Sequence, residues 1–208
     1  MAYTPNLPPP KKYRDLPIRE DNRVDTAVRI LNAAWNALHS RDAEDIALRD
    51  LAVEVGVSQP AAYNHFRDKQ ALFGEVAREA LTTLIRELMV HLPEDAPDLT
   101  GRMKAVTEAW LGFAAARPRH YVLMYSLEFN DPKAFPAVAV RREHLEKLFT
   151  VITQHELGFT AAPAQGHMVL AMLHGAASLI ASGGAKLPVA VVHGAIESHL
   201  AALRKKRK

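Results

Sequence analysis

The 208-residue sequence contains no cysteine, and this absence excludes disulfide bonds, thiolate metal sites and a cysteine nucleophile. It also contains no run of 18 or more uncharged apolar residues, so no segment has the composition of a membrane-spanning helix. The N-terminal stretch MAYTPNLPPPKKYRD lacks the apolar core of a secretory signal. Together these absences predict a cytoplasmic protein that is not attached to a membrane.

The net charge of +3 comes from the end of the chain. The last five residues are all basic: Arg204, Lys205, Lys206, Arg207 and Lys208. Between Arg41 and Lys69, by contrast, four basic residues stand against six acidic ones. That stretch lacks the broad positive surface typical of nucleic-acid-binding proteins, so any DNA contact that it makes must depend on a few placed side chains.

One stretch, ALRDLAVEVGVSQPAAYNHFRDK at 47–69, has the pattern of two short helices joined by a tight turn. Its first half has apolar residues three and four positions apart, which predicts one buried helical face: Leu48, Leu51, Ala52 and Val55. Gly56 favours the left-handed backbone that ends a helix. Ser58 is a favoured N-cap, and Pro60 fits the first turn of a second helix. This is the helix-turn-helix pattern, in which the second helix enters the DNA major groove.

The rest of the sequence predicts helices, with no strand alternation and no internal repeat. One helix is expected before the motif, at 23–39. Those expected after it lie at 69–91, 100–116, 118–127, 136–155, 163–182 and 188–203. We therefore predict an all-α protein with a disordered, proline-rich arm at 1–21, a helix-turn-helix DNA-binding domain at 22–69, a helical body at 70–203 and a basic tail at 204–208.

Three stretches resemble the TetR family of bacterial transcriptional regulators: ILNAAWNAL at 30–38, LRDLAVEVGVSQPAAYNHF at 48–66 and DKQALF at 68–73. FAAARPRHYVLMY at 113–125 and LHGAASLIASG at 173–183 resemble the effector domain of one subgroup more weakly. The resemblance implies a three-helix head joined by a connector helix to a helical-bundle body, and it makes 70–203 an effector-binding and dimerisation domain. It further implies a homodimer that binds a palindromic double-stranded DNA operator and, in most members, represses transcription until a small molecule enters the body.

The resemblance also implies which residues contact DNA. Matched by position, base edges would be faced by Gln59, Pro60, Ala61 and Asn64, phosphates would be contacted by Tyr63 and His65, and Lys69 matches the lysine that opens the connector helix. The predicted DNA-binding set also includes Arg49 and Ser58. Where many members have Thr or Ser before the first helix of the motif, this chain has Ile46 and Ala47, which removes a hydroxyl cap and a phosphate contact.

A second set of residues is predicted to line a cavity for a small apolar effector: Trp110, Phe113, Tyr121, Met124, Tyr125 and His174. Taken singly, each aromatic residue and the methionine is more often part of a core than of a pocket. His174 is interpreted as a polar group that faces either a pocket or a partner helix. Small residues such as Gly175 let helices approach closely, so the helices at 136–155 and 163–182 are predicted to form the dimer interface.

The sequence shows no arrangement of residues for catalysis or for metal binding. His167 and His174 lie seven positions apart, and no carboxylate or thiolate cluster accompanies them, so we expect no metal and no cofactor. No nucleophile, base and orienting residue form a set, so we expect no enzymatic activity. The first hypothesis is a ligand-responsive repressor. The alternative is a dimeric helical module that binds a small molecule and has weak or lost DNA binding.

Overall fold

The computed structural model describes residues 22–90, 92, 99–157, 162–184 and 186–205, and every regular element within this part of the chain is helical. The elements are α1 (Asn22–Ala37), η1 (Ala43–Asp45), α2 (Leu48–Glu54), α3 (Gln59–Tyr63), α4 (Lys69–Val90), α5 (Leu99–Ala116), α6 (Pro118–Met124), η2 (Leu127–Phe129), α7 (Pro136–Leu157), α8 (Ala162–Ala181) and α9 (Val189–Lys205). The predicted all-α fold is confirmed. The arm predicted at 1–21 and the last three residues of the predicted tail lie outside the described residues.

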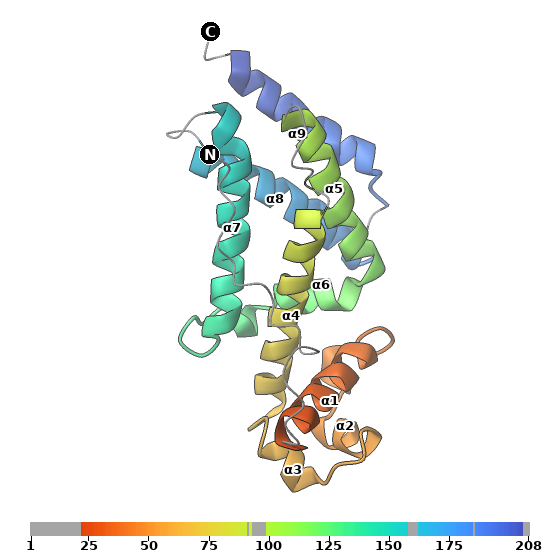
Figure 1. Ribbon diagram of the computed structural model, residues 1–208. Helices are drawn as coiled ribbons and strands as arrows, with labels where there is room; N and C mark the ends of the chain where they lie inside the picture. Colours follow the sequence, from red (N-terminus) through yellow and green to blue (C-terminus); the bar gives the residue numbers. More distant parts are fainter. Residues whose placement is uncertain (1–21, 91, 93–98, 158–161, 185, 206–208) are drawn as a thin grey trace.

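Figure 1 shows two groups of helices joined by one long helix. Helices α1, α2 and α3 form a small head at one end, and α5, α7, α8 and α9 form most of a larger body at the other. Helix α4 runs from the head into the body. Among the described residues, no helix is both long enough and apolar enough to cross a membrane.

The turn between α2 and α3 is fixed by the glycine that the sequence pattern singles out. Gly56 has a φ of 69°, in the left-handed region that favours glycine. Its N–H donates to the Val53 carbonyl at 3.0 Å, and the Val57 N–H donates to the Ala52 carbonyl at 2.9 Å. This pair of bonds is a Schellman motif, which closes the end of α2 and sets the direction in which the chain enters α3.

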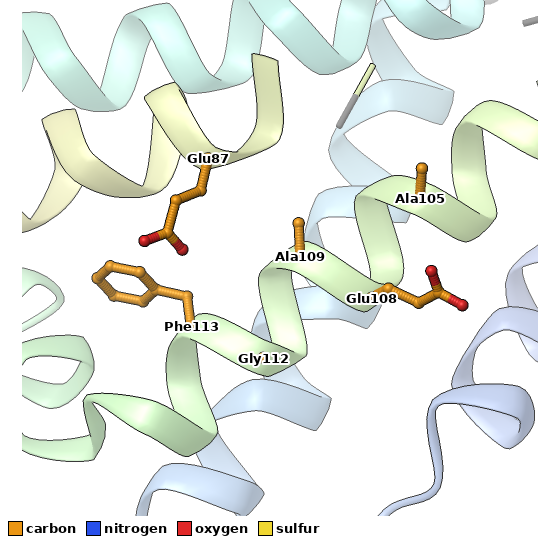
Figure 2. Close-up of a pocket in the computed structure, with 6 residues that line it drawn as sticks. All are labelled: Glu87, Ala105, Glu108, Ala109, Gly112 and Phe113. Carbon is orange, nitrogen blue, oxygen red and sulfur yellow. The ribbon is translucent and has the colours of Figure 1, made fainter. Parts of the chain in front are cut away.

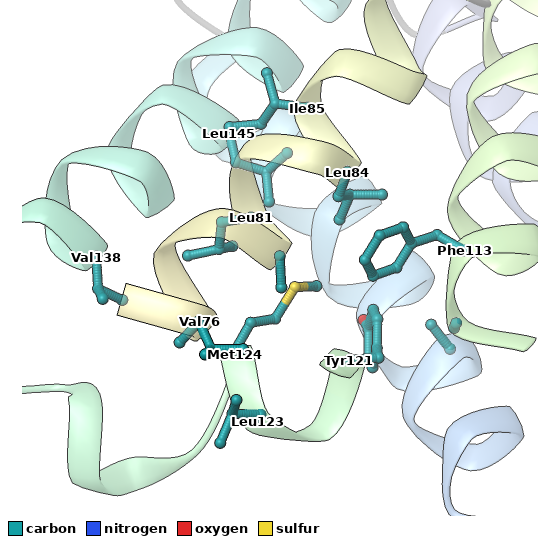
Figure 3. Packing of buried hydrophobic residues seen from close by; sticks show 14 of the residues in the cluster. Val76, Leu81, Leu84, Ile85, Phe113, Tyr121, Leu123, Met124, Val138 and Leu145 are labelled. Carbon is teal, nitrogen blue, oxygen red and sulfur yellow. The ribbon is translucent and has the colours of Figure 1, made fainter. Parts of the chain in front are cut away.

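Helix α4 connects head and body because its apolar stripe continues through both. Its 22 residues span about 33 Å. The Asp68 carboxylate caps its start by accepting the Ala71 N–H at 2.6 Å. Buried side chains follow along its length: Leu72, Phe73, Val76, Ala77, Ala80, Leu81, Leu84, Ile85 and Leu88. Figure 3 shows several of them packed against Phe113, Met124 and Leu145 of α5, α6 and α7.

Helices α7 and α8 pack closely at Gly166. A Cβ atom at this position would lie 2.9 Å from the backbone nitrogen of Thr150 and 3.0 Å from the carbonyl carbon of Phe149. Both are backbone atoms of α7, which cannot move as the end of a side chain does. Gly112 on α5 differs, since a Cβ there would meet no atom within 4 Å.

This contrast predicts opposite effects of the same substitution. Gly166→Ala should lower the free energy of unfolding by about 1–3 kcal/mol, because the methyl group forces α7 and α8 apart. Gly112→Ala should raise it by up to about 1 kcal/mol, because alanine is the better helix former and has room. Urea unfolding of both variants checks this. Equal effects would contradict the close packing at Gly166.

The helix predicted at 118–127 ends earlier than expected, at Met124, and a separate 3-10 turn follows. The reason is a tertiary contact from α7. The Arg142 guanidinium donates to the Met124 carbonyl at 2.8 Å and to the Phe129 carbonyl at 3.3 Å, and it also bonds the Asn130 side chain. The first of these bonds pairs the carbonyl of the last residue of α6, so the helix can stop there without leaving that carbonyl unpaired.

Candidate functional site

The second helix of the motif, α3, presents most of its surface to solvent. Ala62 is its fully buried residue and anchors it to the head. The Ser58 hydroxyl caps its start by accepting the Ala61 N–H at 3.3 Å. Five of the predicted DNA-contacting residues in α3 and beside it are exposed: Ser58, Gln59, Pro60, Tyr63 and Asn64. Ala61 and His65 are half-buried. The helix can therefore offer Gln59, Tyr63 and Asn64 together to a groove.

Lys69, the first residue of α4, is positioned by contacts with η1 and with Phe73. Its ammonium group donates to the Glu44 carbonyl at 2.6 Å and lies 5.8 Å from the centre of the Phe73 ring. A lysine ammonium has three donors, so this bond leaves others for a phosphate. The contact with η1 fixes where Lys69 can reach, at the start of α4.

Three arginines of the head are paired with acidic residues of the head itself. Arg49 lies 3.2 Å from Asp50, Arg67 lies 3.0 Å from Asp68, and Arg41 lies 3.9 Å from Glu54. The predicted DNA contact Arg49 is thus partly neutralised by its neighbour in the chain. Since phosphate neutralisation supplies most of the salt-dependent affinity for DNA, these pairs weaken the electrostatic part of binding.

An Asp50→Asn substitution should therefore tighten DNA binding by freeing Arg49 for a phosphate. One additional phosphate contact in each subunit should steepen the slope of log K against log salt by about 0.9 per subunit. Glu143→Gln is the matched control, because it removes the carboxylate of a similar pair, with Lys147, on α7, outside the head. Titrating labelled DNA at several salt concentrations measures both. An unchanged slope in Asp50→Asn would rule out Arg49 as a phosphate contact.

In the body, four of the six residues predicted for the effector site form one aromatic cluster, and three of them are joined by hydrogen bonds. The Trp110 indole N–H donates to the Tyr121 hydroxyl at 3.1 Å, and that hydroxyl lies 2.9 Å from His174 Nδ1. The Tyr121 hydroxyl thus accepts from Trp110 and is hydrogen-bonded to His174 at the same time. The Tyr125 ring lies 4.0 Å from the His174 ring. Burial raises the pKa of both tyrosines and lowers that of His174, so all three groups are neutral near pH 7.

The structure shows these residues as tightly packed. Trp110, Tyr121 and Met124 are at most 1% exposed, and so is Phe113. A cavity of about 330 Å³ lies instead between α4 and α5 (Figure 2), lined by Glu87, Ala105, Glu108, Ala109, Gly112 and Phe113. Phe113 alone belongs to the predicted set. The other five were not among the predicted residues, although Ala105, Ala109 and Gly112 are spaced along one helical face of α5.

Two residues at the start of α6, Arg119 and His120, contact α1 and the turn after it, and neither was predicted from the sequence. Arg119 donates to the Asp42 carboxylate at 2.6 Å and to the His39 carbonyl at 3.2 Å. His120 is fully buried, and its Nε2 lies 3.0 Å from the Trp35 carbonyl. Burial lowers the pKa of His120 to about 4, so its ring is neutral and Nε2 donates to that carbonyl. The start of α6 is therefore bonded to α1 through Trp35 and to the turn after α1 through His39 and Asp42.

Within the described residues, no three His, Cys, Asp or Glu side chains are placed to hold a metal ion. His174 is engaged with Tyr121, and His167 lies 3.8 Å from the Glu146 carboxylate. The two histidines that lie seven positions apart thus have different partners.

Two family models match the sequence. The model described as bacterial regulatory proteins, tetR family, matches residues 30–76, and the model described as tetracyclin repressor-like, C-terminal domain, matches residues 103–203. The first covers most of the head and the start of α4. The second runs from α5 to α9 and so covers the body.

Similar proteins are found among curated sequences and among solved structures. The nucleoid occlusion factor SlmA of Pectobacterium carotovorum subsp. carotovorum (strain PC1) is 28% identical over 146 residues, which are 67% of this chain and 72% of that protein. A protein with unknown function from Rhodococcus sp. RHA1 superposes with a TM-score of 0.72 at 28% identity, covering 84% of this chain and 93% of that one. A bacterial regulatory protein in the tetR family from Rhodococcus RHA1 superposes with a TM-score of 0.64 at 19% identity, covering 86% and 96%, which shows a shared fold.

Proposed function

Because this chain belongs to the TetR family of bacterial regulatory proteins, and is thus a DNA-binding transcriptional regulator and not an enzyme, we propose that it is a repressor that a small molecule releases from its operator. The observation that carries the proposal is α3, a helix anchored by buried Ala62 that leaves Gln59, Tyr63 and Asn64 exposed together. Amide side chains such as Gln59 and Asn64 have the paired donor and acceptor that read an adenine edge. Tyr63 contacts a phosphate and fixes the register of the helix.

Regulators of this family bind DNA as dimers, and we assign the interface to α8 and α9. The outward face of α8 carries small and apolar residues that solvent reaches: Ala164, Met168, Ala171, Gly175 and Leu179. The outward face of α9 also carries small and apolar residues that solvent reaches: Ala190, Val191, Gly194, Ala195 and Ala202. The prediction from sequence paired α8 with α7 instead. The apolar stripe of α7 is already buried inside the subunit, and its outward face carries the charged pair Glu143 and Lys147.

The mechanism that we propose is a shift between two populations of the dimer. A palindromic operator requires the two recognition helices to sit one helical turn of DNA apart, about 34–36 Å. A small molecule that binds the body favours a position of α6 and α4 in which this spacing is lost. The bonds of Arg119 and His120 to α1 would carry the movement from α6 to the head.

Selection of bound sequences from a random DNA library at low salt tests the repressor proposal. We expect an enriched palindrome, because the dimer presents the same helix twice. Tyr63→Ala should then weaken binding to all sequences alike, whereas Asn64→Ala should change the preferred base at one position of each half-site by about 1–3 kcal/mol. A library without enrichment would instead support the alternative, a helical small-molecule-binding module that has lost DNA binding.

The similarity to SlmA favours a second candidate, a role in nucleoid occlusion. Both candidates use the same DNA-binding head, so the library alone does not separate them. Mapping of the occupied sites on the chromosome does. Few sites, each next to a gene whose transcription rises when the protein is removed, would support the repressor. Many sites without such changes in transcription would support the second candidate.

A further inference from the structure

The cavity between α4 and α5 exists because three successive positions on one face of α5 carry almost no side chain. Ala105, Ala109 and Gly112 form its floor, and Figure 2 shows Glu87 reaching from α4 toward Phe113 across the gap. Its volume of about 330 Å³ is at the lower end of the range of small-molecule sites. The cavity therefore suits a compact ligand.

The glycine on the floor is not needed for helix packing. A Cβ at Gly112 would meet no atom within 4 Å, whereas a Cβ at Gly74 or Gly166 would lie 2.7 Å or 2.9 Å from its nearest neighbour. Those two glycines let another element approach. Gly112 leaves open space.

The charges around the cavity are predominantly negative. Glu87 forms an ion pair with Arg117 at 3.1 Å, so its charge is offset. Glu108 lines the cavity and is exposed to solvent, and its carboxylate has no ion pair or hydrogen bond to a described residue. This solvated carboxylate repels an anion and attracts a cation.

We propose that this cavity binds a small organic ammonium ion with an apolar body, which rests on the small floor of α5 while its charge lies near Glu108. This inference deepens the proposed function, on which its regulatory part rests, by naming the chemical class of the effector. The connection to the head runs through Glu87. A cation in the cavity competes with Arg117 for the Glu87 carboxylate. Arg117 is the N-cap of α6, and the next residues but one, Arg119 and His120, bond to Asp42 and to Trp35 of α1.

The test uses two probes of one shape. Benzyltrimethylammonium is a compact cation, and neopentylbenzene is its neutral isostere, with carbon in place of nitrogen. Calorimetric titration of the full-length protein should show binding of the cation and no binding of the isostere at the same concentration. Equal binding of the two, or no binding of the cation, would overturn the proposal.

Two variants test whether the cation binds in this cavity. Gly112→Leu fills the cavity with a good helix former and should abolish binding of the cation without lowering the melting temperature of the free protein. Glu108→Gln should weaken binding at least about threefold, since it removes one partly exposed ion pair. Glu128→Gln, an exposed carboxylate on η2, is the matched control and should leave binding unchanged. Retained binding in Gly112→Leu would place the cation elsewhere and overturn the proposal.

The failure of this inference is distinguishable from the failure of the repressor proposal. Cation binding is measured without DNA, and operator selection is performed without the cation. Addition of benzyltrimethylammonium to the protein–operator complex should then weaken operator binding in the wild type and not in Gly112→Leu. An operator affinity that does not respond would overturn the effector role.

Discussion

Gly175→Arg is expected to make the protein monomeric and to weaken operator binding by about a hundredfold or more. The substitution places a charge at the centre of the outward face of α8, between Met168 and Leu179, which are 48% and 50% exposed in the single subunit. Burying an unpaired guanidinium between two subunits costs several kcal/mol. Separate monomers also lack the high effective concentration with which a dimer binds its second half-site. This loss lowers the affinity by roughly 10² to 10⁴.

The folded subunit itself should tolerate this change, because a Cβ at Gly175 meets no atom within 4 Å. Light scattering after size-exclusion chromatography gives the oligomeric state, and DNA titration gives the affinity. Val140→Arg on the outward face of α7 is the matched control and should remain dimeric. A dimeric Gly175→Arg with a monomeric Val140→Arg would return the interface to α7.

Tyr121→Phe should lower the free energy of unfolding by about 2–3 kcal/mol. The substitution removes the one hydroxyl that bonds both Trp110 Nε1 and His174 Nδ1. Trp110 is fully buried, so its indole N–H would be left without a partner, at a cost of about 1–3 kcal/mol. His174 is only half-buried, so water can replace part of its lost bond.

Tyr125→Phe is the control for Tyr121→Phe, because the Tyr125 hydroxyl has no hydrogen-bond partner among the described residues. It should cost less than about 1 kcal/mol. Urea unfolding of both variants must use one protein concentration, since the stability of a dimer depends on it. If the two variants unfold at the same midpoint, the Tyr121 hydroxyl does not hold the cluster together.

The head could be predicted from sequence because its geometry depends on neighbours in the chain. The end of α2 is closed by bonds from Gly56 to a residue three positions earlier and from Val57 to a residue five positions earlier, and Ser58 starts α3 through a bond to a residue three positions later. Such local contacts leave a pattern that a reader of the sequence can recognise. The assignment of Gln59, Tyr63 and Asn64 to DNA remains a prediction.

The body was harder to predict because its contacts join residues far apart in the chain. The sequence suggested aromatic residues as pocket lining, yet Trp110 and Tyr121 pack together with His174 and fill the space between their helices. The cavity lies where small residues leave a gap, beside Glu87 and Glu108. Local pattern shows which residues are apolar but does not show which helix faces them.

The sequence by itself thus determined the all-α class, the helix-turn-helix and the course of the chain from head to body, since helix periodicity and capping act over a few residues. Only the tertiary structure decided where α6 ends, which residues join it to α1 and where the body is hollow. Arg142 lies 18 residues from the Met124 carbonyl that it caps, and Arg119 lies 77 residues from Asp42. Contacts over such separations depend on how the helices pack, and no local sequence pattern encodes them.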